Sequence, residues 1–448
     1  MTQLWAKDLP LDALVHRFTV GDDPVTDLAL AAHDAVGSAA HARGLHRAGL
    51  LADADLNALL PALAGIAEDA HKGAFTIAPE QEDCHTAIEH ALIAATGDAG
   101  KRIHLGRSRN DQVLLALRLW QREHLFALVD GVERLAAALL KLAEQNADVP
   151  LPGYTHLRRA MPSSAAQWAS AFAEGLVEEL EAAQGLYRRL DRCPLGAAAG
   201  FGAPLPLERE YAADLLGFAR VQRSTVDVQN ARGRHEVALT GWLASLGLTL
   251  EKLCWDLALY STEEFGFIKL PDAFTTGSSI MPQKRNPDVV ELARATCRAL
   301  RGRHMLVLEL AGGLPSSYHR DFQLLKKPLV DAVGDAETLL VVLERVVNAL
   351  EFDRARAAAA CTDELYAAHD ACRRAGEGLP FRDAYREVAA EIADGSFAPN
   401  RSALAAPHTG GLDNLQLAAT AQALREAHGA FDTPRAHIQQ RLSVIFDV

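Results

Sequence analysis

The sequence predicts an all-α protein, in which an elongated central bundle of long helices is flanked by smaller helical domains. Several long segments, of about 24 to 35 residues each, carry apolar residues at helical spacing, whereas the alternation typical of strands is nearly absent. Hydrophobic residues make up 49% of the 448 residues and aromatic residues only 6%. Most of this apolar content is Ala and Leu, which lose little side-chain freedom in a helix.

Five long helices are expected in the middle of the chain. Pro162 marks the start of the second and Pro287, a favoured first-turn residue, the start of the fourth. Pro328 is expected to bend or interrupt the first part of the fifth helix. At 1.5 Å per residue these helices would be about 35 to 50 Å long, which favours an elongated bundle. The expected ranges run from just after 109–111 to about 144, then 163–190, 234–265, 287–310 and 321–350.

Shorter helical segments predict a smaller domain at each end of the chain. We therefore expect an N-terminal helical domain over residues 1–106, the central bundle over 107–352 and a C-terminal helical domain over 353–448. The helix expected over 234–265 is apolar on most sides, and a five-helix monomer cannot cover all of this apolar surface. The central bundles are therefore expected to associate into a homo-oligomer.

Charge and composition exclude several classes of protein. The formal net charge of −13 argues against nucleic acid and anionic membranes as partners. The N-terminus lacks a basic start followed by an apolar run, and the longest charge-free apolar stretch, residues 237–250, is too short to span a bilayer. The six cysteines show no metal or redox spacing. We expect a cytoplasmic protein with reduced thiols.

The chemically richest segment is residues 277–288, GSSIMPQKRNPD. Its glycine and prolines forbid a continuous helix, so an irregular loop is expected between two long helices. Hydroxyls, cations and backbone donors in such a loop favour closure over an anion. The alternative is a flexible surface connector.

Four further polar segments lie at or near the ends of expected helices, where unpaired backbone groups attract ligands. They are residues 82–90, 106–112 and 152–162, and residues 314–327, which follow the loop. Arg109 could bind a carboxylate through its bidentate fork, although a solvated arginine beside a helix cap is equally compatible. His156 could act as a general acid or base, or only form hydrogen bonds in a turn. His85 and Glu89 share a helix face, but no third metal ligand follows at suitable spacing. We therefore expect no metal.

These segments resemble a known family. GSSIMPQKRNPD resembles the signature loop of the fumarase/aspartase superfamily of helical lyases. The runs IHLGRSRNDQ, PGYTHLRRAMPSS, EEFGFIKLPDAFTTGSSIMPQKRNPD and PFRDAY narrow the resemblance to the argininosuccinate lyases. Fumarases and aspartases typically carry glycine where Gln283 stands. The resemblance covers about residues 25–390, with several long motifs in the same order.

The resemblance implies an all-α homotetramer in which each active site is assembled from three protomers. It implies reversible elimination that splits argininosuccinate into arginine and fumarate without metal or cofactor. By position, Ser278 would be the catalytic base and His156 its partner, with Lys284 and Asn286 in the same loop and Glu291 contacting the catalytic histidine. The implied substrate-binding residues are His85, Arg109, Asn110, Thr155, Tyr318, Gln323 and Lys326.

The residue types suit this chemistry. Removing a proton next to a carboxylate places a second negative charge on that carboxylate, which Lys284, Asn286 and backbone N–H groups could stabilise. A serine hydroxyl is a weak base unless nearby donors and desolvation stabilise its anion. His156 would donate a proton to the departing guanidine or orient a water that does.

The clearest departure from the family lies where a small polar residue would contact the substrate, because this chain reads Gly21-Asp22-Asp23-Pro24 there. Four other functions remain open. Two are sister lyases, acting on adenylosuccinate or on an N-acylated argininosuccinate. A third is a structural protein, since the family includes lens crystallins, although the presumed catalytic residues are intact here. The last is a small-molecule-binding regulator, for which no second sensing module is visible.

Overall fold

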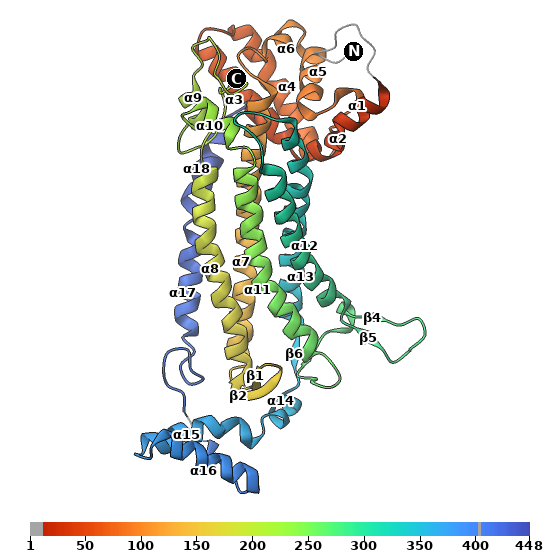
Figure 1. The fold of residues 1–448 in the computed structure, drawn as a ribbon. Coiled ribbons are helices and arrows are strands. Elements are labelled where there is room, and N and C mark those ends of the chain that lie inside the picture. The colour runs from red at the N-terminus through yellow and green to blue at the C-terminus, as the bar shows by residue number, and fades with distance from the viewer. Residues whose placement is uncertain (1–11, 402–404) are drawn as a thin grey trace.

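The computed structural model describes residues 12–401 and 405–448, so the first eleven residues of the expected N-terminal domain lie outside it. The molecule is elongated and almost entirely helical (Figure 1). Five long helices run along its length in alternating directions. They are α7 (Arg109–Gln145), α8 (Ala165–Leu190), α11 (Arg234–Tyr260), α12 (Asp288–Ala311) and α13 (Lys326–Ala349). The all-α class is therefore confirmed.

Helix α7, the longest of the bundle, begins three residues earlier than the sequence predicted. The Ser108 hydroxyl accepts a hydrogen bond from the Asn110 N–H, and the Asp111 carboxylate accepts one from the Ser108 N–H at 2.9 Å. This reciprocal capping satisfies donors that have no partner within the helix. Helix α7 therefore starts at Arg109, and its 37 residues extend about 55 Å.

The other long helices depart from the predicted ranges by small amounts. Helix α8 begins at Ala165, since Ser164 caps it and the residues before it form a strand. Helix α11 ends at Tyr260, five residues before the predicted end. A 3-10 helix, η4 (Arg320–Leu325), precedes α13, so the predicted interruption falls just before Pro328. Pro328 itself lies in the first turn, where a helix needs no N–H.

One apolar core runs through the bundle, and two buried arginines fasten it to the N-terminal region. Arg118 and Arg122 of α7 are at most 2% exposed. Arg118 donates to the Arg192 carbonyl at 2.9 Å, just beyond α8. Arg122 donates to the Leu216 carbonyl at 2.8 Å, at the end of α9 (Arg209–Leu215), and its guanidinium lies over the Phe218 ring. Both side chains thus satisfy carbonyls that helix ends leave unpaired.

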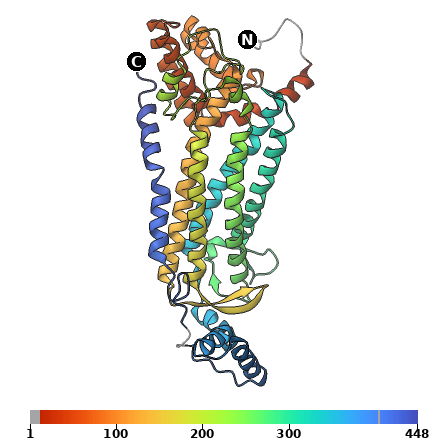
Figure 2. The ribbon, with the colours of Figure 1, turned by 60° about the vertical axis from the view of Figure 1, so that its left-hand side comes forward.

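Shorter helices form the N-terminal region at one end of the bundle (Figures 1 and 2). They enclose a second apolar cluster, to which Leu59, Leu60 and Leu63 belong. The helices here are α1 (Ala13–Val20), α2 (Asp23–Thr26), η1 (Asp27–Ala29), α3 (Ala31–Arg47), α4 (Asp53–His71), η2 (Pro79–Gln81), α5 (Cys84–Thr96) and α6 (Asp98–Arg102). Helix α10 (Thr225–Asn230) lies at the same end of the bundle.

The chain after residue 352 divides into two parts. Helices α14 (Arg354–Ala360), α15 (Ala367–Gly376) and α16 (Phe381–Asp394) lie at the end of the bundle away from the N-terminal region, with η5 (Asp363–Tyr366) among them. Helices α17 (Leu417–Gly429) and α18 (Asp432–Leu442) run back along the bundle and share its core through Leu424 and Phe431. The domain boundaries proposed from the sequence stay a prediction.

Three two-stranded antiparallel sheets complete the described part of the chain, and the sequence did not predict them. The largest joins β1 (Pro150–Thr155) to β2 (Arg158–Ser164). The others pair β3 (Ile268–Lys269) with β6 (Glu351–Phe352), and β4 (Thr276–Gly277) with β5 (Arg285–Asn286), after η3 (Asp272–Phe274). His156 and Leu157 join β1 to β2 with φ values of 53° and 57°. Two such residues in succession are typical of a tight two-residue hairpin turn.

One helical stretch, residues 225–260, is long and apolar enough to cross a membrane by length and composition alone. Half of its apolar window is buried inside the molecule. Core helices of bundles commonly have this composition, since a helix covered on most sides is apolar on most sides.

Candidate functional site

A pocket of about 140 Å³ opens where the N-terminal region meets the bundle. It gathers six of the seven substrate-binding residues expected from the sequence, and Thr155 is the exception. The lining residues are Asp23, Glu82, Asp83, His85, Arg109, Asn110, Val113, Arg232, Tyr318, Arg320, Gln323 and Lys326. They come from the starts of α2, α5 and α7, from the loop before α11 and from the segment leading into α13.

Lys326 is held by two aspartates. Its Nζ lies 2.8 Å from Asp23 Oδ1 and 2.6 Å from Asp27 Oδ1. Burial opposes the charge of Lys326, but the two carboxylates outweigh this effect and raise its pKa. Burial also raises the pKa of Asp23 to about 6, which Lys326 moderates. The Lys326 ammonium is therefore engaged by the protein itself.

His85 forms a second buried ion pair beside the first. Its Nδ1 lies 2.8 Å from Asp34 Oδ2, and Gln112 donates to the same carboxylate. Burial opposes the charge of His85, but attraction to Asp34 is stronger and raises the pKa of His85. Its Nε2 atom is buried and has no hydrogen-bond partner. The ring is thus fixed by one nitrogen while the other remains available to a ligand.

Neighbouring oxygen atoms hold Arg109 and Gln323 of the pocket in place. Arg109 donates to Thr86 Oγ1 at 2.7 Å and lies 3.3 Å from Glu82 Oε2. Gln323 donates to the carbonyls of Thr19 and Val20, at the end of α1. These contacts order the side chains before any ligand arrives, so less conformational entropy is lost on binding.

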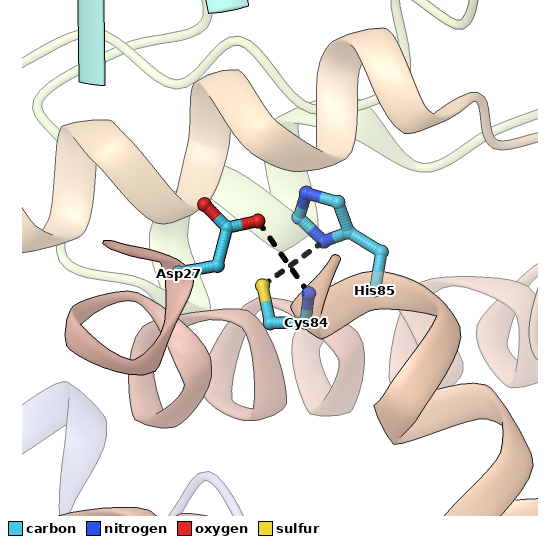
Figure 3. A group of neighbouring side chains, drawn as sticks. All are labelled: Asp27, Cys84 and His85. Atoms are coloured by element: carbon cyan, nitrogen blue, oxygen red, sulfur yellow. Dashed lines mark hydrogen bonds between the residues drawn. The ribbon is translucent and has the colours of Figure 1, made fainter. Parts of the chain in front are cut away.

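Within the described part of the chain, Asp27, Cys84 and His85 form a buried trio whose spacing could hold a metal ion (Figure 3). The Cys84 N–H donates to Asp27 Oδ2 at 3.5 Å, and Cys84 Sγ lies 3.7 Å from His85 Nδ1. However, Lys326 already engages Asp27, and Asp34 engages His85 Nδ1. Burial raises the pKa of the Cys84 thiol well above its usual value, which disfavours the thiolate that a metal needs. The trio fits a hydrogen-bonded network better than a metal site.

Thr155 and His156 lie far from this pocket. Both side chains are exposed at the tip of the β1–β2 hairpin, near α14 at the opposite end of the bundle (Figure 1). Arg109 begins α7, and the hairpin follows shortly after that helix ends. The length of α7 alone therefore separates Arg109 from the start of the hairpin by about 55 Å.

The loop between β4 and β5 carries Ser278 and Lys284, with Asn286 in β5 (Figure 1). The loop projects from the side of the bundle, and it lies between two long helices, α11 and α12, as the sequence led us to expect. Ser278 Oγ accepts hydrogen bonds from the backbone N–H groups of Met281 at 3.1 Å and Ile280 at 3.3 Å. Such donors favour a negative charge on the hydroxyl oxygen. Glu291 is exposed in the first turn of α12.

The expected site residues therefore form three separate groups within one protomer: the pocket, the hairpin tip and the loop. Sequence reasoning missed Asp27 and Asp34, which organise the pocket. It noted Asp23 only as part of a run that departs from the family pattern. Asp23 and Asp27 are four residues apart and Asp34 follows seven later, a helical repeat that could have indicated one buried acidic face.

Comparisons with known proteins agree with this fold. A family model described as "Lyase" matches residues 8–302. The chain is 46% identical over 391 residues to an argininosuccinate lyase of Sorangium cellulosum, covering 87% of this chain and 91% of the relative. It is 41% identical to an argininosuccinate lyase of Parabacteroides distasonis, covering 97% of both chains.

Solved structures share the architecture at low sequence identity. An EDDS lyase variant with bound fumarate matches with a TM-score of 0.73 at 22% identity, covering 98% of this chain and 97% of that one. A fumarate lyase:delta crystallin from Brucella melitensis matches with a TM-score of 0.72 at 20% identity, covering 94% of this chain and 97% of that one. At this identity the likeness concerns the fold alone.

Together, the helical bundle and the matched family model define the protein as a lyase. Within that class, the identities over nearly the whole length are decisive. The chain belongs to the argininosuccinate lyase family.

Proposed function

We propose that the protein splits argininosuccinate into L-arginine and fumarate, as a step of arginine biosynthesis in the cytoplasm. The observation that carries this proposal is the pocket, which gathers six expected substrate-binding residues in a chain 46% identical to an argininosuccinate lyase. Its mixture of cations and carboxylates suits a substrate that carries both charges. The cationic groups also provide the local attraction for carboxylates that the net charge of −13 opposes.

In the proposed mechanism, Ser278 removes the proton from the succinate carbon next to the carboxylate. The two backbone N–H groups at Ser278 Oγ support its anionic form. Lys284 and Asn286 stabilise the doubly charged carboxylate of the intermediate. The C–N bond then breaks, and His156 protonates the guanidine or orients a water that does. Glu291 contacts the histidine and orients it.

We further propose that the active protein is a homotetramer whose sites each draw on three protomers. The separation of the pocket, the hairpin tip and the loop supports this assembly, since the length of α7 lies between the first two. An apolar face on the central helices supports it as well. There Leu248, Trp255, Leu292 and Met305 are 45 to 68% exposed on α11 and α12.

The direct test is release of fumarate from argininosuccinate by the purified full-length protein, followed by ultraviolet absorbance. We expect turnover of argininosuccinate and none of adenylosuccinate, whose leaving group is a nucleotide rather than an amino acid. Absence of fumarate at neutral pH would refute the proposal. Sedimentation should give a tetramer, and a stable monomer would contradict the shared site.

A further inference from the structure

The charges around Lys326 do not balance. One ammonium faces the carboxylates of Asp23 and Asp27 at 2.8 and 2.6 Å, and all three residues are at most 9% exposed. The neighbouring His85–Asp34 pair is already balanced within itself. Among these three residues there is one carboxylate more than there are cations, and buried charges are stable only when they are paired.

Asp23 is the carboxylate that can receive this missing cation. It lines the pocket, whereas Asp27 is fully buried and does not. Among the residues that the structure describes, Lys326 is the single partner of the Asp23 side chain, bound through Oδ1. Its second carboxylate oxygen is therefore left for a ligand, and burial without that partner is why the pKa of Asp23 rises to about 6.

His85 supplies the complementary group in the same pocket. Its side chain is 5% exposed, its Nδ1 is fixed by Asp34, and its buried Nε2 has no partner. Attraction to Asp34 favours the protonated ring, so Nε2 is a donor suited to a carboxylate. An unpaired carboxylate oxygen and an unpaired N–H donor together match the ammonium and carboxylate of a free α-amino acid.

The substrate has two cationic groups, and only one can reach Asp23. The guanidine nitrogen is bonded to the succinate carbon adjacent to the one that Ser278 deprotonates, so the guanidinium must stay with the reacting groups. The α-ammonium lies at the far end of the arginine chain. The α-ammonium is therefore the cation that the pocket can bind at a distance from the reacting groups.

We propose that Asp23 binds the α-ammonium group of the substrate's arginine half and thereby selects free argininosuccinate over an N-acylated form. This inference rests on the proposed function. An acyl group turns the ammonium into a neutral amide, which leaves the second carboxylate oxygen of Asp23 without a partner. Sites built around a buried polar partner reject analogues that lack the matching group.

The test compares two substrates, argininosuccinate and Nα-acetyl-argininosuccinate, across three full-length proteins: wild type, Asp23→Asn and Asp22→Asn. Asp22 is the matched control, because it is exposed, adjacent and acidic. We expect wild type to prefer the free substrate by about 100-fold in kcat/KM. Asp23→Asn should lose most of this preference, mainly through a higher KM for the free substrate, with little change for the acetylated one. Asp22→Asn should behave as wild type.

A positioning role for Asp23, in which it only holds Lys326, predicts a different result. Asp23→Asn would then lower kcat/KM for both substrates equally, and that outcome would overturn the inference. Equal use of both substrates by wild type would do the same.

A binding measurement separates this inference from the proposed function. Calorimetry with L-arginine and Nα-acetyl-L-arginine needs no turnover. Wild type should bind L-arginine at least about tenfold more tightly than its acetylated form, and Asp23→Asn should remove the difference. If wild type releases no fumarate but shows this preference, the proposed reaction fails and the role of Asp23 stands. If it binds both forms equally, or neither, the role of Asp23 is refuted.

Discussion

The pocket and the loop differ in how far each is complete within one chain. In the pocket, His85 and Lys326 are buried and already paired with Asp34, Asp23 and Asp27. In the loop, Lys284 is exposed, and the hydrogen bonds of Ser278 come only from the loop's own backbone. Buried polar networks require fixed partners, whereas an exposed loop can wait for a substrate or a second protomer. The comparison teaches that the pocket side chains are organised within one chain, and we propose that the reacting groups of the loop are brought to them.

The largest expected effect is on the loop. Ser278→Ala removes the proposed base, so turnover of argininosuccinate should fall by at least about 1,000-fold while the helical content stays the same. Fumarate release and circular dichroism measure the two quantities. The matched control is Ser279→Ala, a neighbouring exposed serine, which should retain most of the activity. Near-normal turnover by Ser278→Ala would show that Ser278 is not the catalytic base.

Mixing two inactive variants tests whether the pocket and the loop act across protomers. Ser278→Ala and Arg109→Ala are each expected to be inactive alone. In mixed tetramers from equal amounts of the two chains, about a quarter of the sites should combine an intact loop with an intact pocket. Activity after co-expression should therefore approach about a quarter of the wild-type value. If both groups served the same site from one chain, mixing would restore nothing.

A smaller effect is expected when a buried ion pair of the pocket is broken, and it concerns the stability of the whole protein. Asp34→Asn removes the partner of a buried His85 and should lower the free energy of unfolding by about 3 to 5 kcal/mol. Urea unfolding at equal protein concentration measures this change. The control is Glu68→Gln, which breaks the exposed Glu68–Lys72 pair and should leave the unfolding curve unchanged.

The buried His85–Asp34 pair also predicts how the stability of the protein depends on pH. The pKa of His85 is raised above 6.5, so its contribution is complete below that value and is lost as pH rises through the raised pKa. The pKa of Asp34 is lowered below 3.8, because His85, Arg107 and Gln112 outweigh its burial, so its contribution is present above 3.8 and is lost in acid. The effect of Asp34→Asn should therefore be largest between these values, near about pH 5 to 6. An effect that grows steadily above neutral pH would contradict the ion pair.

Most of the long-helix architecture could be read from the sequence. Helix α8 ends at Leu190 and α11 begins at Arg234, as the apolar spacing indicated, because amphipathic periodicity continues until the core face ends. The β1–β2 hairpin was missed because its three prolines and its turn hid any alternation. The return of α17 along the bundle was also missed, since its core contacts join residues more than 200 positions apart, such as Gln184 and Ala427.

The candidate site likewise has a part that the sequence indicated and a part that only the structure revealed. The residue types in GSSIMPQKRNPD and SRNDQ indicated anion binding, because hydroxyls, cations and backbone donors lie there in close succession. The resemblance of these runs to a known family, rather than their residue types, implied proton removal. The importance of Asp23 was not visible, because its partner Lys326 lies 303 positions later in the chain.

By itself, the sequence determined the helical class, the family and the segments that carry the chemistry, since periodicity and contiguous motifs are local properties of a chain. Only the tertiary structure decided that six of the expected binding residues share one pocket while the hairpin and the loop lie elsewhere. It also decided that two aspartates face one lysine there. Charge balance depends on which groups lie within a few ångströms of each other, and that proximity is created by packing rather than by order along the chain.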